Sequence, residues 1–380
     1  MGATLPTVKR DAAAQTTKKS KKQQPVARCG NVPEDIEDVH LRSGMQPVRG
    51  REPVTSQDEA WLQRLQECKD VEPLYEFADL RAVHLELTTQ CNAACPQCAR
   101  SDRGGPPNPL LAQSHAELSL ADIKMMLPPQ VLQQLKKVYL CGNYGDPAVA
   151  RDCLEVLQYF REERPGLKAG LFTNGGVRSP SWWAQLGRIM QPRGKAFVRF
   201  AIDGDKDTNA LYRQNVVWER LMDNVKAFIG AGGVAEWDFI VFEHNEHIVE
   251  KMRELSQELG FVKFNAKRTA RFLNRKQGGM LEHTPVKDAA GNVVRHLKPP
   301  RNREWQNEAV VADVQRAIQS YGSIDAYYDQ TEVSCKVAQE REVYISAQGL
   351  AFPCCWLAGE LYNMNDKDRQ FARLLSTLDP

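Results

Sequence analysis

The sequence lacks any apolar run close to the ~20 residues that a membrane-spanning helix needs. It also lacks an apolar N-terminal stretch of the kind that directs secretion, so we expect no export and a cytoplasmic location. Cysteine, by contrast, is plentiful, with ten residues. In a chain without an export signal, these are better interpreted as metal ligands or reduced thiols than as disulfides. Membrane proteins, collagens, coiled coils and small disulfide scaffolds are therefore excluded.

A strong overall charge is absent too, because the net charge is only +2 over 380 residues. Residues 1–30 hold seven Lys and Arg against one Asp, an excess of six positive charges, which leaves an excess of four negative charges elsewhere. The body therefore has no strongly basic surface by charge count, and a nucleic-acid partner is not expected. Residues 1–50 show no sustained apolar period and are predicted to form a disordered basic tail, followed by a helical lead-in over 51–79.

From about residue 80, short apolar runs alternate with amphipathic segments. Ser119 with Asp122 forms a capping-box pattern, and Ser179 before Pro180 marks another helix start. Six strand–helix units predict parallel strands with right-handed crossovers, either in an open doubly wound sheet or in a barrel. In both arrangements, functional residues lie at the C-terminal ends of the strands. The predicted strands are 82–88, 137–140, 168–173, 196–202, 236–242 and 261–266, and the predicted helices are 119–135, 148–163, 180–190, 207–229 and 246–259.

The chain is longer than the roughly 250–300 residues at which one hydrophobic core stops growing, so a second, smaller region is expected. Residues 80–283 hold the strand–helix units. Residues 284–309 are rich in Pro and charge and are predicted to be a loop or linker. A small α+β extension over 310–380 follows, with a helix near 308–320 and a strand near 342–346.

Three cysteines follow the first predicted strand directly, in the run Cys91-Asn-Ala-Ala-Cys95-Pro-Gln-Cys98. Three thiols within eight residues suit a metal centre. Structural zinc needs a fourth ligand, for which His84, His115, Cys141 and Cys335 are candidates. An iron–sulfur cluster also takes thiolates at short spacing, and three cysteines leave one of four irons open for chemistry. Buried free cysteines are the remaining interpretation.

This three-cysteine run, at the end of the first strand of six β/α units, resembles the radical SAM superfamily over about residues 80–270. The resemblance implies a partial (β/α)6 barrel and a [4Fe-4S] cluster on Cys91, Cys95 and Cys98. It implies that the open iron binds S-adenosylmethionine. A one-electron donor such as a flavodoxin or ferredoxin then triggers its cleavage to a 5′-deoxyadenosyl radical, which abstracts hydrogen from a substrate.

Further stretches match the family at the ends of strands two to five. The run from Cys141 to Pro147 resembles the glycine-rich segment that binds the methionyl amino group, and Arg213 suits the methionyl carboxylate. The predicted strand ends themselves supply four polar residues, in agreement with the rule for parallel strands. The residues that the resemblance assigns to cofactor binding are Gly142, Asn143, Gly145, Asp146, Asn174, Asp203, Arg213 and Asn245.

Each of these residues also has a purely structural interpretation. Asp146 before Pro147 is a typical helix N-cap, and Asn174 before a glycine is typical of a tight turn. Arg213 can form a surface salt bridge, and Asn245 can cap the helix that begins at the next residue. One departure from the family stands out: Gln97 precedes the third cysteine, where many members have an aromatic residue that packs against adenine. No adenine-binding residue is therefore assigned.

A second cysteine group, Cys335, Gly349, Cys354 and Cys355, resembles the start of the SPASM and Twitch extensions found behind radical SAM barrels. Those extensions bind an auxiliary iron–sulfur cluster, which Cys335, Cys354 and Cys355 would hold here. No cysteine follows Cys355, so the full pattern is incomplete. A truncated chain, borrowed ligands and a β-hairpin with buried cysteines all remain open.

The substrate is not determined by the sequence, and no catalytic residue is assigned. His84, Glu86, Arg199 and Arg268 fall at inward or terminal strand positions, where they line a polar cavity or form buried ion pairs. SPASM-type relatives act on peptides and other relatives on small molecules, so a peptide or a small molecule is the expected substrate. The alternatives are a zinc protein whose basic tail binds nucleic acid, and a degenerate member that binds a cluster without turnover.

Overall fold

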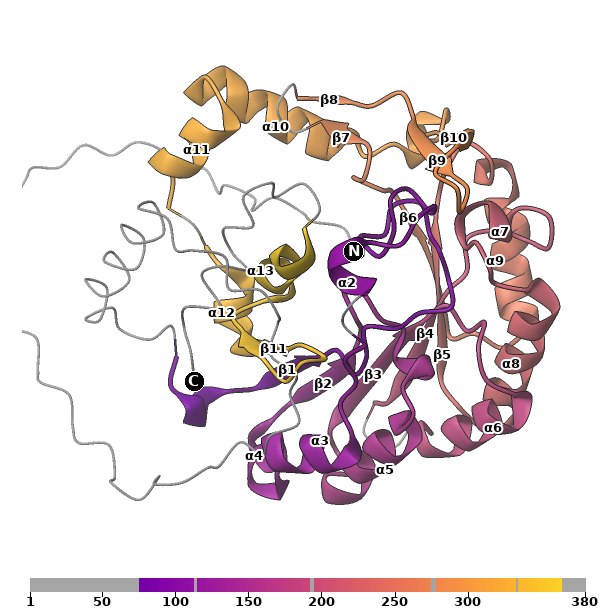
Figure 1. The fold of residues 1–380 in the computed structure, drawn as a ribbon, viewed down its shortest axis with the longest axis vertical. Coiled ribbons are helices and arrows are strands. Elements are labelled where there is room, and N and C mark those ends of the chain that lie inside the picture. Colours follow the sequence, from indigo (N-terminus) through magenta and orange to yellow (C-terminus); the bar gives the residue numbers. More distant parts are fainter. Residues whose placement is uncertain (1–74, 113–114, 192–194, 275–277, 333, 364–380) are drawn as a thin grey trace, which may run out of the picture.

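The fold is built around one large sheet, as a computed structural model describes it for residues 75–112, 115–191, 195–274, 278–332 and 334–363 (Figure 1). Within those residues the sheet has eight strands in the order β12-β11-β1-β2-β3-β4-β5-β6. Every neighbouring pair from β11 to β6 is parallel, and β12 is antiparallel to β11. The strands are β1 (Ala82–Leu85), β2 (Lys137–Leu140), β3 (Lys168–Thr173), β4 (Phe197–Ala201), β5 (Ala235–Ile240), β6 (Lys263–Lys267), β11 (Glu342–Ile345) and β12 (Ala351–Phe352).

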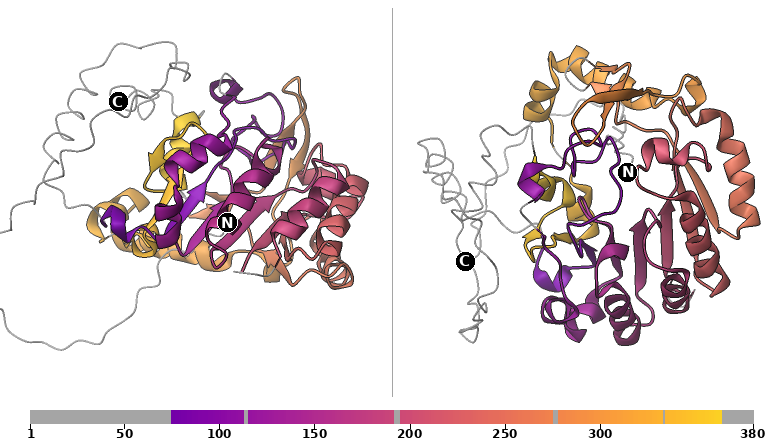
Figure 2. Two further views of the ribbon diagram at one scale, coloured as in Figure 1. Left: turned by 90° about the horizontal axis from the view of Figure 1, so that it is seen from below. Right: turned by 45° about the vertical axis from the view of Figure 1, so that its right-hand side comes forward.

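The six strands expected from the sequence are β1 to β6, in parallel and in chain order. Helices cover the outer face of the curved sheet, so that strands and helices form an open ring (Figures 1 and 2). These helices are α3 (Leu120–Met126), α4 (Pro129–Gln134), α5 (Cys153–Glu163), α6 (Pro180–Ile189), α8 (Trp218–Gly230) and α9 (Val249–Glu258).

Two expected helices are interrupted. The segment 119–135 divides into α3 and α4 because Pro128 and Pro129 lack the N–H groups that a continuous helix requires. The segment 207–229 divides into α7 (Asn209–Tyr212) and α8, with Asn215 at a φ of 68° between them, outside helical geometry. Both predicted caps are confirmed: Ser119 and Asp122 form a reciprocal capping box, and Ser179 accepts from the N–H of Trp182.

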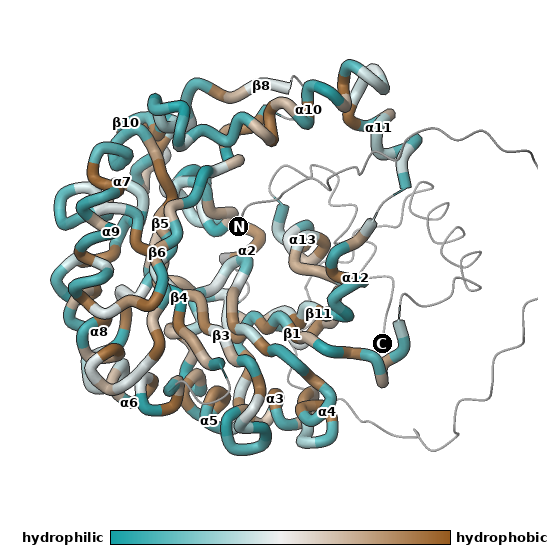
Figure 3. The backbone as a smooth tube through the Cα atoms, turned by 180° about the vertical axis from the view of Figure 1, so that it is seen from behind, coloured by the Kyte–Doolittle hydropathy of each residue, from teal (hydrophilic) through white to brown (hydrophobic). Residues whose placement is uncertain are grey.

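The hydrophobic core lies between the sheet and these helices. Alternate residues of β1, Val83 and Leu85, are completely buried there. Large aromatic side chains fill the space near β4 and β5, among them Trp183, Phe200 and Phe228, which pack ring against ring. Figure 3 shows this distribution by residue hydropathy: hydrophobic residues lie along β4 and β5, and hydrophobic and hydrophilic residues alternate along the outer helices. This packing holds the C-terminal ends of the strands at one edge.

The expected linker over 284–309 is not a plain loop. It contains an antiparallel hairpin of β9 (Thr284–Lys287) and β10 (Val293–Leu297), in which Val286 and Leu297 are buried. The alternation of buried and more exposed positions in β9 is typical of a strand, and the Pro and Gly content of the segment obscured it. A second, shorter hairpin pairs β7 (Leu273–Asn274) with β8 (Gly279–Met280), and α2 (Pro109–Ala112) follows the cysteine run.

The C-terminal segment begins with α10 (Glu308–Tyr321) and α11 (Ile324–Gln330), followed by α12 (Lys336–Glu340), and α13 (Cys355–Ala358) comes after β12. The expected helix near 308–320 and strand near 342–346 are both confirmed, as α10 and β11. β11 pairs with β1 and so continues the main sheet. The predicted tail over 1–50 and most of the lead-in over 51–79 lie outside the described residues. Among the described helices, none combines the length and apolar character that crossing a bilayer requires.

Candidate functional site

The three cysteines lie in the segment that follows β1, at the C-terminal edge of the sheet. Cys95 is buried, and Cys91 and Cys98 are half-buried. The N–H of Cys98 donates to the carbonyl of Cys95 over 3.0 Å, which closes a turn that brings the two residues together. Burial raises the pKa of Cys91 and of Cys95; Asp146 raises that of Cys91 further, whereas the positive charge of Arg213 lowers that of Cys95.

Hydrogen-bond donors from two different segments of the chain reach the sulfur atoms. Asn174 Nδ2, after β3, lies 3.6 Å from Cys91 Sγ, and Arg213 Nη1, after α7, lies 3.6 Å from Cys95 Sγ. The backbone N–H of Ala93 also donates to Cys91 Sγ over 3.4 Å. Thiolates are stabilised by such donors and by nearby positive charge. The cysteine segment thus meets the expected cofactor residues on both of its sides.

Asp146 and Asn174 form one side of this cluster. Asp146 is buried and accepts from Asn174 N and Nδ2 over 2.7 Å and 2.6 Å, and from Thr173 Oγ1 over 2.8 Å. Burial raises the pKa of the Asp146 carboxyl, and these donors counteract the effect. Asp146 also accepts from Ala148 N, which confirms the predicted N-cap, and its assignment to cofactor binding stays a prediction. Thr173 was missed by the sequence reasoning.

Asp203, Arg213 and Asn245 form the other side. Asp203 is fully buried, and its two oxygens accept from Arg213 Nε and from Ile240 N, each over 2.6 Å. Asn245 does not cap the helix that follows it. Its amide instead donates to the carbonyls of Asp203 and Ile240 and accepts from Phe242 N. Asn245 therefore connects the ends of β4 and β5, and Arg213 forms a buried ion pair instead of a surface salt bridge.

The glycine-rich segment 141–146 is held by a residue whose role the sequence left open. Glu86, buried at the end of β1, accepts from Tyr144 N over 2.7 Å, from Gly145 N over 3.0 Å and from the Tyr344 hydroxyl. A Cβ atom at Gly145 would lie 1.6 Å from the Thr88 carbonyl oxygen, and one at Gly142 would lie 2.6 Å from Glu86. The glycines therefore let the segment pack against the chain after β1, and only a residue without a side chain fits.

The C-terminal region covers the same segment. Asn143 Nδ2 donates to the carbonyl of Cys355 over 2.6 Å, and the Tyr144 hydroxyl donates to the carbonyl of Gly359 over 2.5 Å. Asn108, after the cysteine run, donates to the carbonyl of Tyr362 over 2.8 Å. Asn143, which the resemblance assigns to cofactor binding, therefore contacts α13 in this structure.

The second cysteine group flanks a hairpin and lies outside its strands. β11 and β12 form this hairpin, with Gly349 at a φ of 81° in the turn, and none of the three cysteines is buried, so the interpretation as a hairpin with buried cysteines is wrong in that respect. Cys335 is exposed at the N-cap of α12, and Cys354 and Cys355 are half-buried at the start of α13. Within the described ranges, no three His, Cys, Asp or Glu side chains are arranged to hold a single metal ion. An auxiliary cluster stays a prediction.

An iron–sulfur cluster on Cys91, Cys95 and Cys98 fits the residues present. A cluster is larger than a single ion and holds its sulfur ligands further apart, so the lack of a compact ion site does not count against it. The donor set is three thiols with N–H groups directed at the sulfurs. The amide of Gln97 is buried with both its nitrogen and its oxygen lacking a partner among the described residues, as expected next to a group that binds there.

Polar side chains on the inner face of the sheet pair with one another. Arg199 Nε donates to Glu236 over 2.9 Å, and Lys267 pairs with Asp238. His84 contacts the carbonyl of Cys141 and stacks on Tyr139 at 4.4 Å. Arg199 therefore forms an ion pair with Glu236 that is half-buried instead of buried, and Arg268, at the end of β6, has no ion pair within the described part of the chain.

No family model matches the sequence, and no curated protein does either. Among solved structures, Streptococcus suis SuiB bound to the precursor peptide SuiA has a TM-score of 0.50 at 11% identity, over 86% of this chain and 72% of SuiB. SuiB bound to S-adenosylmethionine has a TM-score of 0.48 at 12% identity, over 82% of this chain and 72% of that one. The protein anSMEcpe with bound AdoMet has a TM-score of 0.43 at 14% identity, over 77% and 80% of the two chains.

At this level of identity, the likeness to SuiB with its peptide shows a shared fold and nothing about the reaction, and the two weaker matches add nothing to it. Together with the parallel sheet and its outer helices, it confirms the fold class expected from the sequence, an α/β partial barrel. The SPASM or Twitch resemblance of the C-terminal region stays a prediction.

Proposed function

We infer that the protein is a radical SAM enzyme, with a [4Fe-4S] cluster on Cys91, Cys95 and Cys98. One observation carries this proposal: the cysteine segment is hydrogen-bonded through its sulfurs to Asn174 on one side and Arg213 on the other. Both residues belong to the set that the resemblance assigns to S-adenosylmethionine. When bound, such a cluster would supply the one electron that cleaves S-adenosylmethionine to methionine and a 5′-deoxyadenosyl radical, and that radical would abstract hydrogen from a substrate.

The chain's own residues supply binding and orientation. The segment with Gly142, Asn143 and Gly145, together with Asp146 and Asn174, is proposed for the methionyl amino group, because it offers acceptors at a buried edge. Arg213 is proposed for the methionyl carboxylate, since a guanidinium binds a carboxylate in a fixed geometry. Asp203 and Asn245 position Arg213 and the strand ends by the contacts described above. Burial of the cluster region excludes water, which protects reactive species.

Metal analysis of paired variants tests the proposal. After anaerobic reconstitution with iron and sulfide, Cys95→Ala should hold about four irons fewer than the wild-type chain. Cys153→Ala, at a cysteine buried in α5, should hold as many irons as the wild-type chain. Zinc in place of iron would contradict the proposal and favour the zinc-protein alternative, and equal iron in both variants would contradict the ligand assignment.

The same proposal covers the auxiliary cluster, the electron donor, the location, the substrate and the division of the chain that the sequence predicts. We include an auxiliary cluster on Cys335, Cys354 and Cys355, a one-electron donor such as a flavodoxin or ferredoxin, and a cytoplasmic location. SuiB has been solved with a precursor peptide, and a peptide or small-molecule substrate is proposed here. We also propose a barrel over 80–283, a connection over 284–309 and a SPASM-like or Twitch-like extension over 310–380. About eight irons per chain would support the auxiliary cluster, and about four would contradict it.

A further inference from the structure

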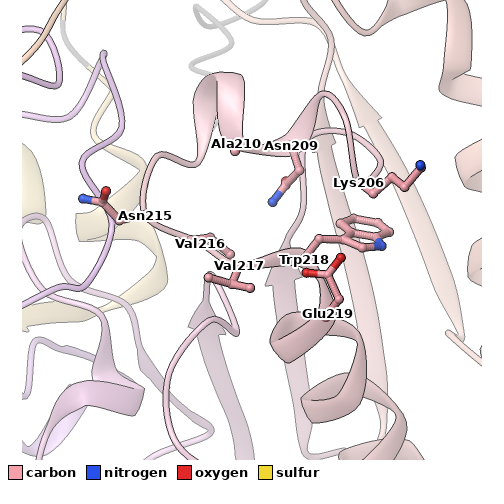
Figure 4. Close-up of a pocket in the computed structure, with 8 residues that line it drawn as sticks. All are labelled: Lys206, Asn209, Ala210, Asn215, Val216, Val217, Trp218 and Glu219. Atoms are coloured by element: carbon pink, nitrogen blue, oxygen red, sulfur yellow. The ribbon is translucent and has the colours of Figure 1, made fainter.

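A pocket of about 340 Å³ opens between α7 and the first turn of α8, at a place that no sequence motif marks (Figure 4). Its volume lies at the small end of the ~300–1,000 Å³ typical of small-molecule sites, so it suits a ligand of metabolite size. None of the cysteines lines it. It therefore has to be explained separately from the cluster and its cofactor.

One buried polar group in this pocket lacks a partner. Asn209 is only 1% exposed, and its Oδ1 accepts from the N–H of Asp203 over 2.9 Å. Its Nδ2 is buried and has no hydrogen-bond partner among the residues that the structure describes. Figure 4 shows this amide nitrogen directed into the pocket. Leaving a buried N–H unsatisfied is costly, so a ligand that offers an acceptor here is favoured.

The start of α8 adds a second donor surface. This helix of 13 residues begins at Trp218, and no side chain caps its first turn within the described part of the chain. The exposed N–H groups and the dipole of a helix N-terminus favour a negatively charged group. Lys206 lines the same pocket, but its amine lies 3.8 Å from Asp207 and its side chain is largely exposed, so its charge contributes little there. Asn209 and the helix start together therefore favour a carboxylate or another anion.

Two further features narrow the choice of anion. Glu219 also lines the pocket, and its charge opposes a dianion such as phosphate more strongly than a single carboxylate. Val216, Val217 and Trp218 supply an apolar wall. We propose that the pocket binds an apolar amino acid through its carboxylate, either as a free amino acid or as the C-terminal residue of a peptide.

The pocket is connected to the cluster region by the same asparagine. Asn209 Oδ1 holds the backbone of Asp203, and Asp203 holds Arg213, which reaches Cys95. A ligand on Asn209 would therefore lie next to the residues that position Arg213. The binding itself does not depend on the proposed reaction, because it needs neither cluster nor S-adenosylmethionine.

A ligand-detected NMR titration of the full-length apo chain tests this proposal with three probes. L-leucine and N-acetyl-L-leucine carry the carboxylate, and L-leucinamide does not. We expect saturable binding of at least one of the first two, and at least tenfold weaker binding of L-leucinamide, as the loss of a charge-assisted hydrogen bond predicts. Tighter binding of L-leucine indicates a free amino acid, and tighter binding of the acetylated form indicates a peptide C-terminus.

Two variants locate the binding. Asn209→Asp retains the Oδ1 acceptor for Asp203 but loses the donor, so binding should weaken at least tenfold. Val217→Trp, at a residue 55% exposed, should block the pocket, and Val262→Trp, at a residue 66% exposed elsewhere, should leave binding unchanged. The proposal is wrong if neither carboxylate probe binds saturably, if L-leucinamide binds equally well, or if both pocket variants retain wild-type affinity.

Discussion

The ion pair between Arg213 and Asp203 allows a quantitative test of how the site is held together. Arg213 Nε lies 2.6 Å from Asp203 Oδ2, and the Asp203 side chain is fully buried. Burial alone would lower the pKa of Arg213, but the charges of Asp203 and Cys95 raise it well above its ordinary value. Removing one partner of a buried pair costs about 3–5 kcal/mol, because the other charge is left unpaired. Asp203→Asn should lower the free energy of unfolding by about that amount.

Urea unfolding followed by tryptophan fluorescence measures this difference. A nearby pair gives the control: Lys251 Nζ lies 3.2 Å from Asp205, but Lys251 is 66% exposed. Lys251→Met should therefore cost no more than about 1 kcal/mol. The double variant Asp203→Asn with Arg213→Met should recover part of the loss, because no buried charge remains unpaired. If Asp203→Asn costs no more than Lys251→Met, the pair does not organise the site as we describe.

Three further predictions concern stability. Gly145→Ala should lower the free energy of unfolding in urea by at least about 1–3 kcal/mol, because its Cβ would lie 1.6 Å from the Thr88 carbonyl oxygen. Gly166→Ala, with no atom within 4 Å of its Cβ, should have little effect. Burial lowers the pKa of His84 from 6.5 to about 4, so the stability from neutral His84 is complete above pH 6.5 and lost as the pH falls through about 4. Urea unfolding of His84→Gln should therefore depend less on pH in this window, with up to about 3 kcal/mol of the wild-type dependence removed. Ser119→Ala should cost about 1 kcal/mol through loss of the capping box, and an unchanged melting temperature would contradict this.

Much of the fold follows from local sequence patterns. The strands β1 to β6 are short apolar runs separated by amphipathic helices, and their parallel order follows from the repeated strand–helix unit. The hairpin of β9 and β10 was missed because only a few of its side chains, such as Val286 and Leu297, are buried. The pairing of β11 with β1 was missed for a different reason, since it joins residues more than 250 positions apart and no local pattern encodes it.

The candidate site likewise combines residues that local sequence patterns predict with residues that they do not. The rule that functional residues follow parallel strands located Asp146, Asn174, Asp203 and Asn245, and the structure brings them together around the cysteine segment. Their partners could not be derived in this way. In the sequence, Glu86 belongs to a predicted strand and is one of several polar residues expected on its inner face. Its contacts with the N–H groups of the glycine-rich segment could be seen only in the structure.

The pocket beside Asn209 lay beyond sequence reasoning altogether. Asparagine is common in turns, and nothing in the sequence shows that one of its amide atoms is satisfied while the other is buried without a partner. The interruption between α7 and α8 that creates the pocket depends on the backbone at Asn215, which a helical pattern over 207–229 does not reveal.

Formation of 5′-deoxyadenosine is the most direct test of the central claim. The reconstituted chain is mixed anaerobically with dithionite and S-adenosylmethionine, and the products are separated by liquid chromatography. We predict 5′-deoxyadenosine from the wild-type chain and none from Cys95→Ala. A fully iron-loaded wild-type chain that forms none, or a Cys95→Ala chain that forms as much, would contradict the account of this site as a radical SAM centre.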